Sequence, residues 1–402
     1  MLPESQWSKS VAADFSLYLH IPFCLSRCRY CAFYSTVANP VPEKEYLAAL
    51  LNHFQVALAD WQGRRLRSVY LGGGTPSLLS PSFYSTFFNR LFSHFHEHPD
   101  IEITLEANPA TLSREKIREY QFLGINRFSL GAQTFADQGL TLLGRRHSSA
   151  DIHAAVAMLY DCGVENLSLD LIYAYPGQTL AGLRRDLEMV VTLEPTHVSA
   201  YCLALEPGTP LANDVQSGRL PTPRADDQCR FMEETARFLS ASGYEHYEIS
   251  NFCRPGRRSR HNLAYWELKD YWGLGAGAWS AKRLEKNAGC WAVRYLDESD
   301  VKKYLRRFGG SEGSLARPLP VETDAISYQT SFAERLIMGL RLVEGVDLAA
   351  VADEYDHELV KQALSRLEGS LREGLVERVD DRLRLTSRGL LLADEIALIL
   401  LD

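Results

Sequence analysis

The sequence lacks any uninterrupted apolar run of about 18 residues, the length that a helix needs to cross a membrane. Its first ten residues also lack the basic stretch and following apolar stretch of a secretory signal. Basic residues are not in excess, because 43 Lys and Arg stand against 51 Asp and Glu, a net charge of −8. We therefore expect a cytoplasmic protein, neither integral to a membrane nor bound to nucleic acid.

The composition also lacks the signatures of disorder and of a small disulfide-stapled domain. Hydrophobic residues make up 46% and charged residues 23%, as in ordinary globular proteins. A length of 402 residues predicts two or three domains. Three of the eight cysteines (Cys24, Cys28 and Cys31) lie within eight residues of one another, and the other five stand singly. In a reducing compartment such clustering indicates metal binding.

Six short β-type runs recur, and each is followed by a segment with helical periodicity. They cover residues 15–20, 67–72, 101–106, 126–131, 166–172 and 196–202. This alternation predicts parallel strands joined by crossover helices. Polar or glycine-rich residues stand at the ends of the first five runs, and a (β/α) barrel builds its site from the C-terminal ends of its strands. We predict an α/β fold with a partial (β/α)6 TIM-like barrel.

The remaining sequence predicts how the chain is divided. Residues 324–402 show helical patterns and a β-hairpin pattern around Asp380-Asp381, which together resemble a winged helix. This part holds 9 Lys and Arg against 16 Asp and Glu, so we expect it to pack or dock and not to read DNA. The expected parts are an N-terminal extension (1–14), the barrel (15–245), an aromatic-rich segment that completes the core (246–306), a linker (307–323) and a C-terminal helical, winged-helix-like domain (324–402).

The clustered cysteines have the spacing C-x3-C-x2-C directly after the first predicted strand. A structural zinc site needs four nitrogen or sulfur ligands, whereas a [4Fe–4S] cluster held by three cysteines leaves one iron open to another ligand. We therefore predict a [4Fe–4S] cluster on Cys24, Cys28 and Cys31. The alternatives are three incidental core cysteines and a zinc site completed by His20.

Together with Gly72-Gly73-Gly74-Thr75-Pro76, the cysteine loop resembles that of the radical S-adenosylmethionine (SAM) superfamily, in which the open iron binds the amino and carboxylate groups of SAM. The segment Tyr18-Leu-His-Ile-Pro-Phe-Cys24 narrows the resemblance to the oxygen-independent coproporphyrinogen III oxidases and the HemW-type heme chaperones. The oxidases carry one more cysteine two residues after Cys31, where this chain has Phe33. The chaperones carry His-Asn-x-x-Tyr-Trp, which is present at residues 261–266. The resemblance therefore favours the chaperones.

The resemblance also implies which residues contact SAM. They are Tyr18, Tyr30, Gly73, Gly74, Thr75, Glu106, Gln133, Arg145, Asp170 and Ala204. Gln133, Arg145 and Asp170 match positions that contact a second SAM in the oxidases. Structural alternatives exist, because Arg145 and Asp170 could form an ion pair, Glu106 could pair with an arginine, and Tyr18 could be an inward-facing aromatic residue.

The His-Asn-x-x-Tyr-Trp segment has the chemistry to hold heme. His261 and Tyr265 would share a helix face, and imidazole and phenolate are both axial ligands of heme iron. The resemblance implies a heme site with His261, Asn262, Tyr265 and Trp266, and it leaves the axial ligand open among His261, Tyr265, Cys253 and Cys290. A satisfied structural histidine is the alternative.

Four arginines lie directly upstream of this segment, and a guanidinium matches the geometry of a heme propionate. They are Arg254, Arg257, Arg258 and Arg260. A solvated loop or a docking patch for an acidic surface is the equally weighted alternative. By resemblance, we expect a heme chaperone that carries the cluster and SAM, and that delivers heme to membrane-located acceptor proteins. The alternative is a coproporphyrinogen III oxidase. The oligomeric state stays open, a dimer included.

Overall fold

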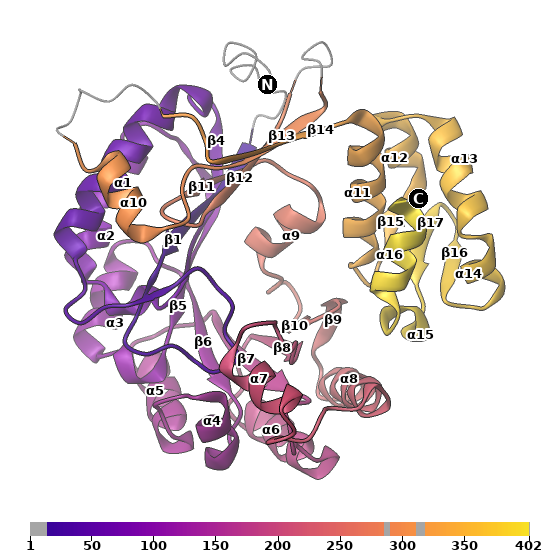
Figure 1. Cartoon of the computed structure of the whole chain (residues 1–402), viewed down its shortest axis with the longest axis horizontal. Coiled ribbons are helices and arrows are strands. Elements are labelled where there is room, and N and C mark those ends of the chain that lie inside the picture. Colours follow the sequence, from indigo (N-terminus) through magenta and orange to yellow (C-terminus); the bar gives the residue numbers. More distant parts are fainter. Residues whose placement is uncertain (1–13, 285–289, 311–317, 402) are drawn as a thin grey trace.

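The computed structural model describes residues 14–284, 290–310 and 318–401. The expected N-terminal extension, apart from Asp14, and most of the glycine-rich part of the expected linker lie outside the described residues. Figure 1 shows a large α/β part and, beside it, a smaller C-terminal part.

Six parallel strands form the centre of the large part, in the order in which they follow one another in the sequence. They are β1 (Asp14–Ile21), β4 (Arg65–Gly73), β5 (Glu97–Ala107), β6 (Arg127–Gln133), β7 (Leu167–Tyr173) and β8 (His197–Cys202). They coincide with the six predicted runs to within a few residues. The prediction of a parallel α/β core is confirmed.

Helices connect these strands and cover the outer face of the sheet (Figure 1). The longer ones are α1 (Glu43–Ala57), α2 (Pro81–Phe92), α3 (Arg114–Phe122), α5 (Ser149–Asp161), α6 (Leu180–Thr192) and α8 (Ala225–Ala241). Hydroxyl side chains start several of them: Ser148 forms a capping box with Asp151, and Thr179 caps α6. Between the sheet and the helices lies a continuous core of fully buried side chains such as Leu17, Val69 and Phe128.

In the described parts of the chain, the sheet extends beyond the six strands at both edges and has 12 strands. β11 (Tyr271–Leu274) pairs parallel with β1, and β12 (Trp279–Arg283), β13 (Ala292–Leu296) and β14 (Glu322–Ile326) follow antiparallel. At the other edge, β10 (Asn251–Cys253) pairs with β8, and β9 (Glu245–Glu248) pairs with β10. The sheet therefore continues past residue 323, the end of the expected linker. β14 is polar and exposed along most of its length, which explains why its sequence does not predict a strand.

The C-terminal part has its own hydrophobic core, with Leu336, Val351, Leu367 and Leu383 at its centre. Its elements are α11 (Tyr328–Leu340), β15 (Val346–Asp347), α12 (Leu348–Glu354), α13 (His357–Arg366), α14 (Glu368–Arg372), β16 (Val376–Val379), β17 (Arg382–Leu385), α15 (Ser387–Leu390) and α16 (Ala393–Leu401). The predicted hairpin is present, and its turn places Asp380 at a positive φ of 53°. Within the described residues, no helix combines the length and the apolar character that crossing a membrane requires.

Candidate cluster and cofactor site

A cavity of about 880 Å³ opens at the C-terminal ends of the parallel strands. Every residue that the sequence assigns to the cluster or to SAM lines this cavity, with the exception of Tyr18. They are Cys24, Cys28, Tyr30 and Cys31 from the loop after β1, Gly73, Gly74 and Thr75 from the end of β4, Glu106 from β5, Gln133 from β6, Arg145 from the loop after α4 (Asp137–Leu143), Asp170 from β7 and Ala204 from the loop after β8. Residues spread over 180 positions of sequence thus meet in one hollow, as a barrel site requires.

The three cysteine thiols face this cavity and are free. Thr75 Oγ1 donates to Cys24 Sγ at 3.7 Å, and Arg145 Nη1 donates to Cys28 Sγ at 3.5 Å. Burial raises the pKa values of the Cys24 and Cys31 thiols, so charge from a bound metal is what would hold them as thiolates. In the described part of the chain, no three His, Cys, Asp or Glu side chains converge closely enough for a single metal ion. The three thiols therefore fit a polynuclear cluster better than one zinc ion.

His20 is held by the protein and does not join the cysteines. Its Nε2 donates to the Tyr34 carbonyl oxygen at 2.8 Å, so Nδ1, at 3.0 Å, accepts from the Tyr18 hydroxyl. Both ring nitrogens are used, and burial lowers the pKa of the imidazole. This arrangement does not support the alternative of a zinc site completed by His20. Tyr18 thus supports the base of the cysteine loop.

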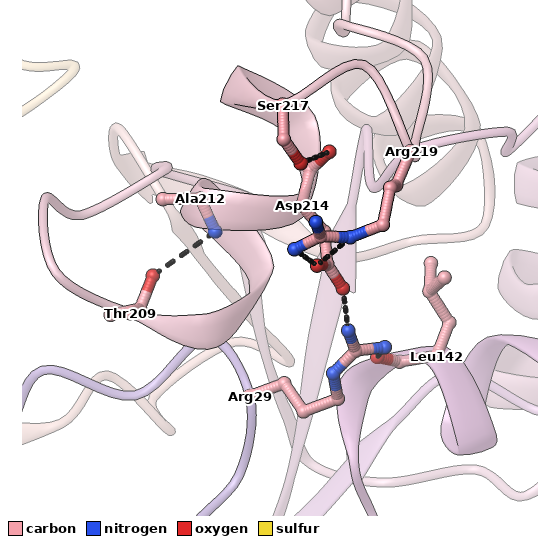
Figure 2. Close-up of polar contacts among 7 residues, drawn as sticks. All are labelled: Arg29, Leu142, Thr209, Ala212, Asp214, Ser217 and Arg219. Carbon is pink, nitrogen blue, oxygen red and sulfur yellow. Dashed lines mark hydrogen bonds and ion pairs between the residues drawn. The ribbon is translucent and has the colours of Figure 1, made fainter.

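Arg29 fastens the cysteine loop to two helices. Its backbone N–H donates to the Leu143 carbonyl oxygen at 3.0 Å, and its own carbonyl oxygen accepts from the Leu211 N–H at 2.9 Å. Its guanidinium forms an ion pair with Asp214 of α7 (Pro210–Gln216), as Figure 2 shows. Arg219 Nε donates to the same Asp214 carboxylate at 2.7 Å. The position of Cys28 is therefore fixed through its neighbour.

Glycine is required at two points where the backbone closes on the cysteine loop. A Cβ at Gly74 would lie 2.6 Å from the Phe23 carbonyl oxygen and 3.0 Å from Cys24 Sγ. Gly73 has a φ of +116°, and a Cβ there would lie 2.6 Å from His20 Cε1. The end of β4 can thus approach the cysteines only because it has no side chains.

Two half-buried carboxyl groups face the cavity. Glu106 accepts from the Tyr70 hydroxyl at 2.8 Å and from the Gly73 N–H at 3.1 Å, and burial raises its pKa to about 7. Its hydrogen-bond partners are a tyrosine and the backbone, where the sequence alternative expected an arginine. Asp170 accepts from Ser129 Oγ at 3.0 Å, and burial raises its pKa to about 6.

The guanidinium of Arg145 lies at the end of the cavity that carries the cysteines. Nη2 donates to the Gly131 carbonyl oxygen at 3.1 Å, while Nη1 contacts Cys28. Among the described residues, Arg145 and Asp170 form no ion pair with each other. Nearby, Gln133 has a φ of 69°, an uncommon conformation for a residue other than glycine. Such backbone strain often accompanies a ligand site.

The His-Asn-x-x-Tyr-Trp segment forms the short helix α9 (Arg260–Trp266). His261 is 1% exposed, and its Nδ1 lies 2.9 Å from Ser68 Oγ. Ser68 gives its own proton to Ser16, so His261 Nδ1 is the donor and Nε2 accepts from the Tyr265 hydroxyl at 3.0 Å. Burial lowers the pKa of His261 to about 3, which keeps the ring neutral. In this conformation His261 is a structural histidine with both ring nitrogens hydrogen-bonded, which is the alternative to a heme ligand.

The other three motif residues differ in their surroundings. Asn262 lines the cavity, whereas His261, Tyr265 and Trp266 do not. The Tyr265 ring packs edge-on against Tyr271 at 4.7 Å between centroids. The guanidinium of Arg341 lies 4.5 Å from the centroid of the Trp266 ring. The remaining axial-ligand candidates are Cys253, fully buried in β10, and the half-buried Cys290.

The four arginines upstream of His261, of which Arg260 is the first residue of α9, are engaged with protein groups. Arg254 donates to the Ser242 carbonyl oxygen at 2.7 Å. Arg258 forms ion pairs with Glu245 and, at 3.3 Å, with Glu344 of the C-terminal part. Arg257 lies 3.9 Å from Glu165, and Arg260 donates to the Asp100 carbonyl oxygen. This arrangement does not support a propionate clamp, because acceptors of the protein already bind these guanidinium groups.

Sequence reasoning missed several residues of the cavity wall, among them Arg127, Ser129 and Gly131. They alternate along β6 with the predicted residue Gln133, and all four line the cavity. The sequence signal that could have found them is the alternation of side chains along a strand, which places every second residue of a barrel strand on the inner face. All of β6 is buried, so the sequence does not show which alternate set faces inward.

The comparisons with known proteins agree with this geometry. Residues 18–190 match the family model of the radical SAM superfamily, and residues 328–392 match that of the HemN C-terminal domain. The E. coli coproporphyrinogen III oxidase HemN, a radical SAM enzyme, superposes with a TM-score of 0.82 over 98% of this chain and 92% of its own, at 23% identity. That likeness shows a shared fold. The cysteine-lined cavity and these matches define a protein of the radical SAM superfamily.

Curated relatives narrow this class. The heme chaperone HemW of Lactococcus lactis is 33% identical over 388 residues, which cover 95% of this chain and 96% of the relative. HemW of Mycobacterium tuberculosis is 35% identical over 390 residues, which cover 96% and 95%. The chain belongs to the HemW family of heme chaperones.

Proposed function

We propose that this chain binds heme and passes it to acceptor proteins, with a [4Fe–4S] cluster and SAM bound in the same cavity. One observation carries the proposal: the wall that holds the three cysteines also includes Asn262 of the His-Asn-x-x-Tyr-Trp segment. The three cysteines and one residue of the segment expected to bind heme therefore border the same space. The names of the relatives support heme as the cargo.

Membership of the radical SAM superfamily implies a [4Fe–4S] cluster and SAM as cofactors. Cys24, Cys28 and Cys31 would hold the cluster, and Gly73, Gly74 and Thr75 would border the cofactor beside it. A cluster held by three cysteines supplies an open iron and a one-electron redox centre. The glycines beside the cysteines have no side chains, so a ligand can lie directly against the backbone. Arg145 places a positive charge next to Cys28.

The alternative is oxidative decarboxylation of coproporphyrinogen III. The shared fold with HemN is compatible with both functions. Phe33 favours the chaperone, because it stands where the oxidases carry a cysteine, and its ring is 65% exposed at the rim of the cavity. A thiol at this point of the loop would lie next to the cluster ligands, whereas a phenyl ring offers only apolar surface. The apolar rim suits a flat, apolar cargo such as heme.

We further propose that the acceptors are membrane-located proteins that receive heme from the rim of the cavity. The rim carries the exposed apolar side chains of Leu25 and Phe33, 42% and 65% exposed. Apolar side chains grouped at the mouth of a cavity are a common feature of sites that meet a ligand or a partner. Heme would thus leave the cavity past the cysteine loop, where the acceptor would dock.

Anaerobic reconstitution with iron and sulfide, followed by two parallel assays, tests the proposal. One assay titrates heme and records its absorption spectrum; the other supplies reductant, SAM and coproporphyrinogen III and measures substrate consumption. We expect stoichiometric heme uptake and no consumption. Turnover of coproporphyrinogen without heme uptake would replace the chaperone with the oxidase.

A further inference from the structure

Arg127 is a buried cation without a hydrogen-bonding partner. Its side chain is 2% exposed, and it lines the cavity from the first position of β6. No hydrogen bond or ion pair joins it to another residue in the described parts of the chain, and its Nε is buried without a partner. A buried guanidinium without acceptors is costly. Such a residue points to a ligand that the protein alone does not supply.

The acidic residues near Arg127 are occupied elsewhere. Glu102 attracts the guanidinium electrostatically, but its two carboxylate oxygens accept from the backbone N–H groups of Arg260 and His261, at 3.2 and 3.1 Å. Asp170 also attracts it, but accepts from Ser129 and Ser168. The charge of Arg127 is thus partly balanced at a distance, while its donors stay unsatisfied on the cavity side.

The backbone of Arg127 lies deeper in the barrel than the cysteine end. Gly131, four residues further along β6, accepts from Arg145, which also contacts Cys28 and so marks the level of the cluster. At about 3.3 Å per residue, the Cα of Arg127 lies roughly 13 Å before that level, and its guanidinium reaches back to within electrostatic range of Asp170, the strand partner of Gly131. In the radical SAM superfamily the open iron binds the carboxylate of SAM. The guanidinium of Arg127 is therefore available to the carboxylate of another molecule in the same cavity.

A carboxylate is the group that a guanidinium fork fits best, since two parallel N–H donors match its two oxygens. Resting on the proposed function, the cargo that brings carboxylates into this cavity is heme, with its two propionates. We propose that Arg127 binds a heme propionate in this cavity, whose wall also includes Asn262. This assigns to Arg127 the role that the sequence had suggested for the arginines upstream of His261.

The test compares heme with heme dimethyl ester, whose propionates carry no charge, on reconstituted protein. Four proteins are titrated with each: the parent, Arg127→Gln, Arg127→Lys and Arg64→Gln. Arg64 is a matched control, because it is a buried arginine paired with Asp270 that does not line the cavity. SAM binding and iron content are measured on the same samples.

We expect Arg127→Gln to bind heme at least about tenfold more weakly than the parent, which corresponds to about 1.4 kcal/mol. It should bind the ester as the parent does and keep SAM and iron. Arg127→Lys should lose less, and Arg64→Gln should bind both hemes like the parent.

Three results would overturn the inference. They are unchanged heme affinity in Arg127→Gln, equal loss of heme and ester, and loss of SAM in place of heme. The second indicates disturbed folding, and the third assigns the carboxylate to the cofactor. A parent that binds neither heme would instead contradict the proposed function, which keeps the two failures distinguishable.

Discussion

The two ends of the cavity differ in how their polar groups are satisfied. At the cysteine end, three free thiols and the strained Gln133 face open space. At the α9 end, His261 uses both ring nitrogens on the protein, and Glu102 accepts two backbone N–H groups. The cysteine end therefore offers three free thiols to a ligand. The α9 end is a hydrogen-bonded layer in which, of His261, Glu102 and Arg127, only Arg127 has no hydrogen-bond partner in the described parts of the chain.

This difference changes how the His-Asn-x-x-Tyr-Trp segment is interpreted. A ligand of heme iron needs a free lone pair, and the Nε2 lone pair of His261 is directed at the Tyr265 hydroxyl. Ligation by His261 therefore requires Tyr265 to give up this hydrogen bond. In this conformation the segment contributes shape to the cavity through Asn262, while His261 stabilises the barrel.

The largest effect is expected at the cysteine end. Replacing Cys24, Cys28 or Cys31 by alanine should reduce iron in the reconstituted protein from about four per chain to near zero, because two thiolates do not hold the cluster. Iron and sulfide analysis with absorption spectroscopy measures this. Cys202 is a matched control, since it lines the same cavity outside the motif; Cys202→Ala should keep the cluster. A normal cluster in Cys28→Ala would refute the assignment.

The next effect concerns the closed end. His261→Ala removes two buried hydrogen bonds and leaves a cavity, so the free energy of unfolding should fall by about 2–4 kcal/mol. Urea unfolding of the cluster-free protein measures it. His357→Ala, at an exposed position, should change stability little. If both variants are equally stable, His261 does not stabilise the barrel.

The third prediction concerns Glu106, at the cysteine end, and the pH dependence of the free energy of unfolding. Its pKa is raised from an ordinary value of 4.5 to about 7, so the folded protein holds this proton more tightly than the unfolded chain. The resulting stabilisation is complete below about pH 4.5 and is lost as the pH rises through about 7. Unfolding free energies of the cluster-free protein from pH 5 to 8 should therefore depend less on pH in Glu106→Gln. The exposed Glu119→Gln should keep the slope of the parent; a parental slope in Glu106→Gln would contradict the argument.

The smallest effect is expected at the anchor of the cysteine loop. Asp214→Asn weakens the ion pairs to Arg29 and Arg219, which are partly exposed, so the free energy of unfolding should fall only slightly. The cluster should form but lose iron to a chelator faster than in the parent. Asp227→Asn, on the surface of α8, is the control. Equal rates of iron loss in all three proteins would show that the anchor does not position Cys28.

The sequence predicted the parts whose signals are local. The six parallel strands follow from apolar runs, and the cysteine loop and Gly73-Gly74-Thr75 follow from spacing. It could not predict the strands that extend the sheet, because β9, β10 and β14 are short or polar and depend on their neighbours for pairing. Strand formation at an edge is decided by the partner strand more than by composition.

The same limit applies to individual site residues. The sequence does not show that Tyr18 hydrogen-bonds to His20, because this role depends on how the cysteine loop folds back on β1. It also does not show that the four arginines upstream of His261 are paired, because partners such as Glu344 for Arg258 lie far away in the chain. Arg127 is the opposite case. In the sequence it is an ordinary strand residue, and only the fold shows that its buried Nε has no hydrogen-bond acceptor among the described residues.

The central claim is that the two ends of the cavity serve different ligands, and one measurement tests it most directly: iron content and heme affinity, determined on the same preparations of the parent, Cys28→Ala and Arg127→Gln. We predict that Cys28→Ala loses its iron and keeps heme binding, while Arg127→Gln keeps about four irons per chain and binds heme at least about tenfold more weakly than the parent. Loss of iron and heme together in both variants, or unchanged heme affinity in Arg127→Gln, would contradict the account.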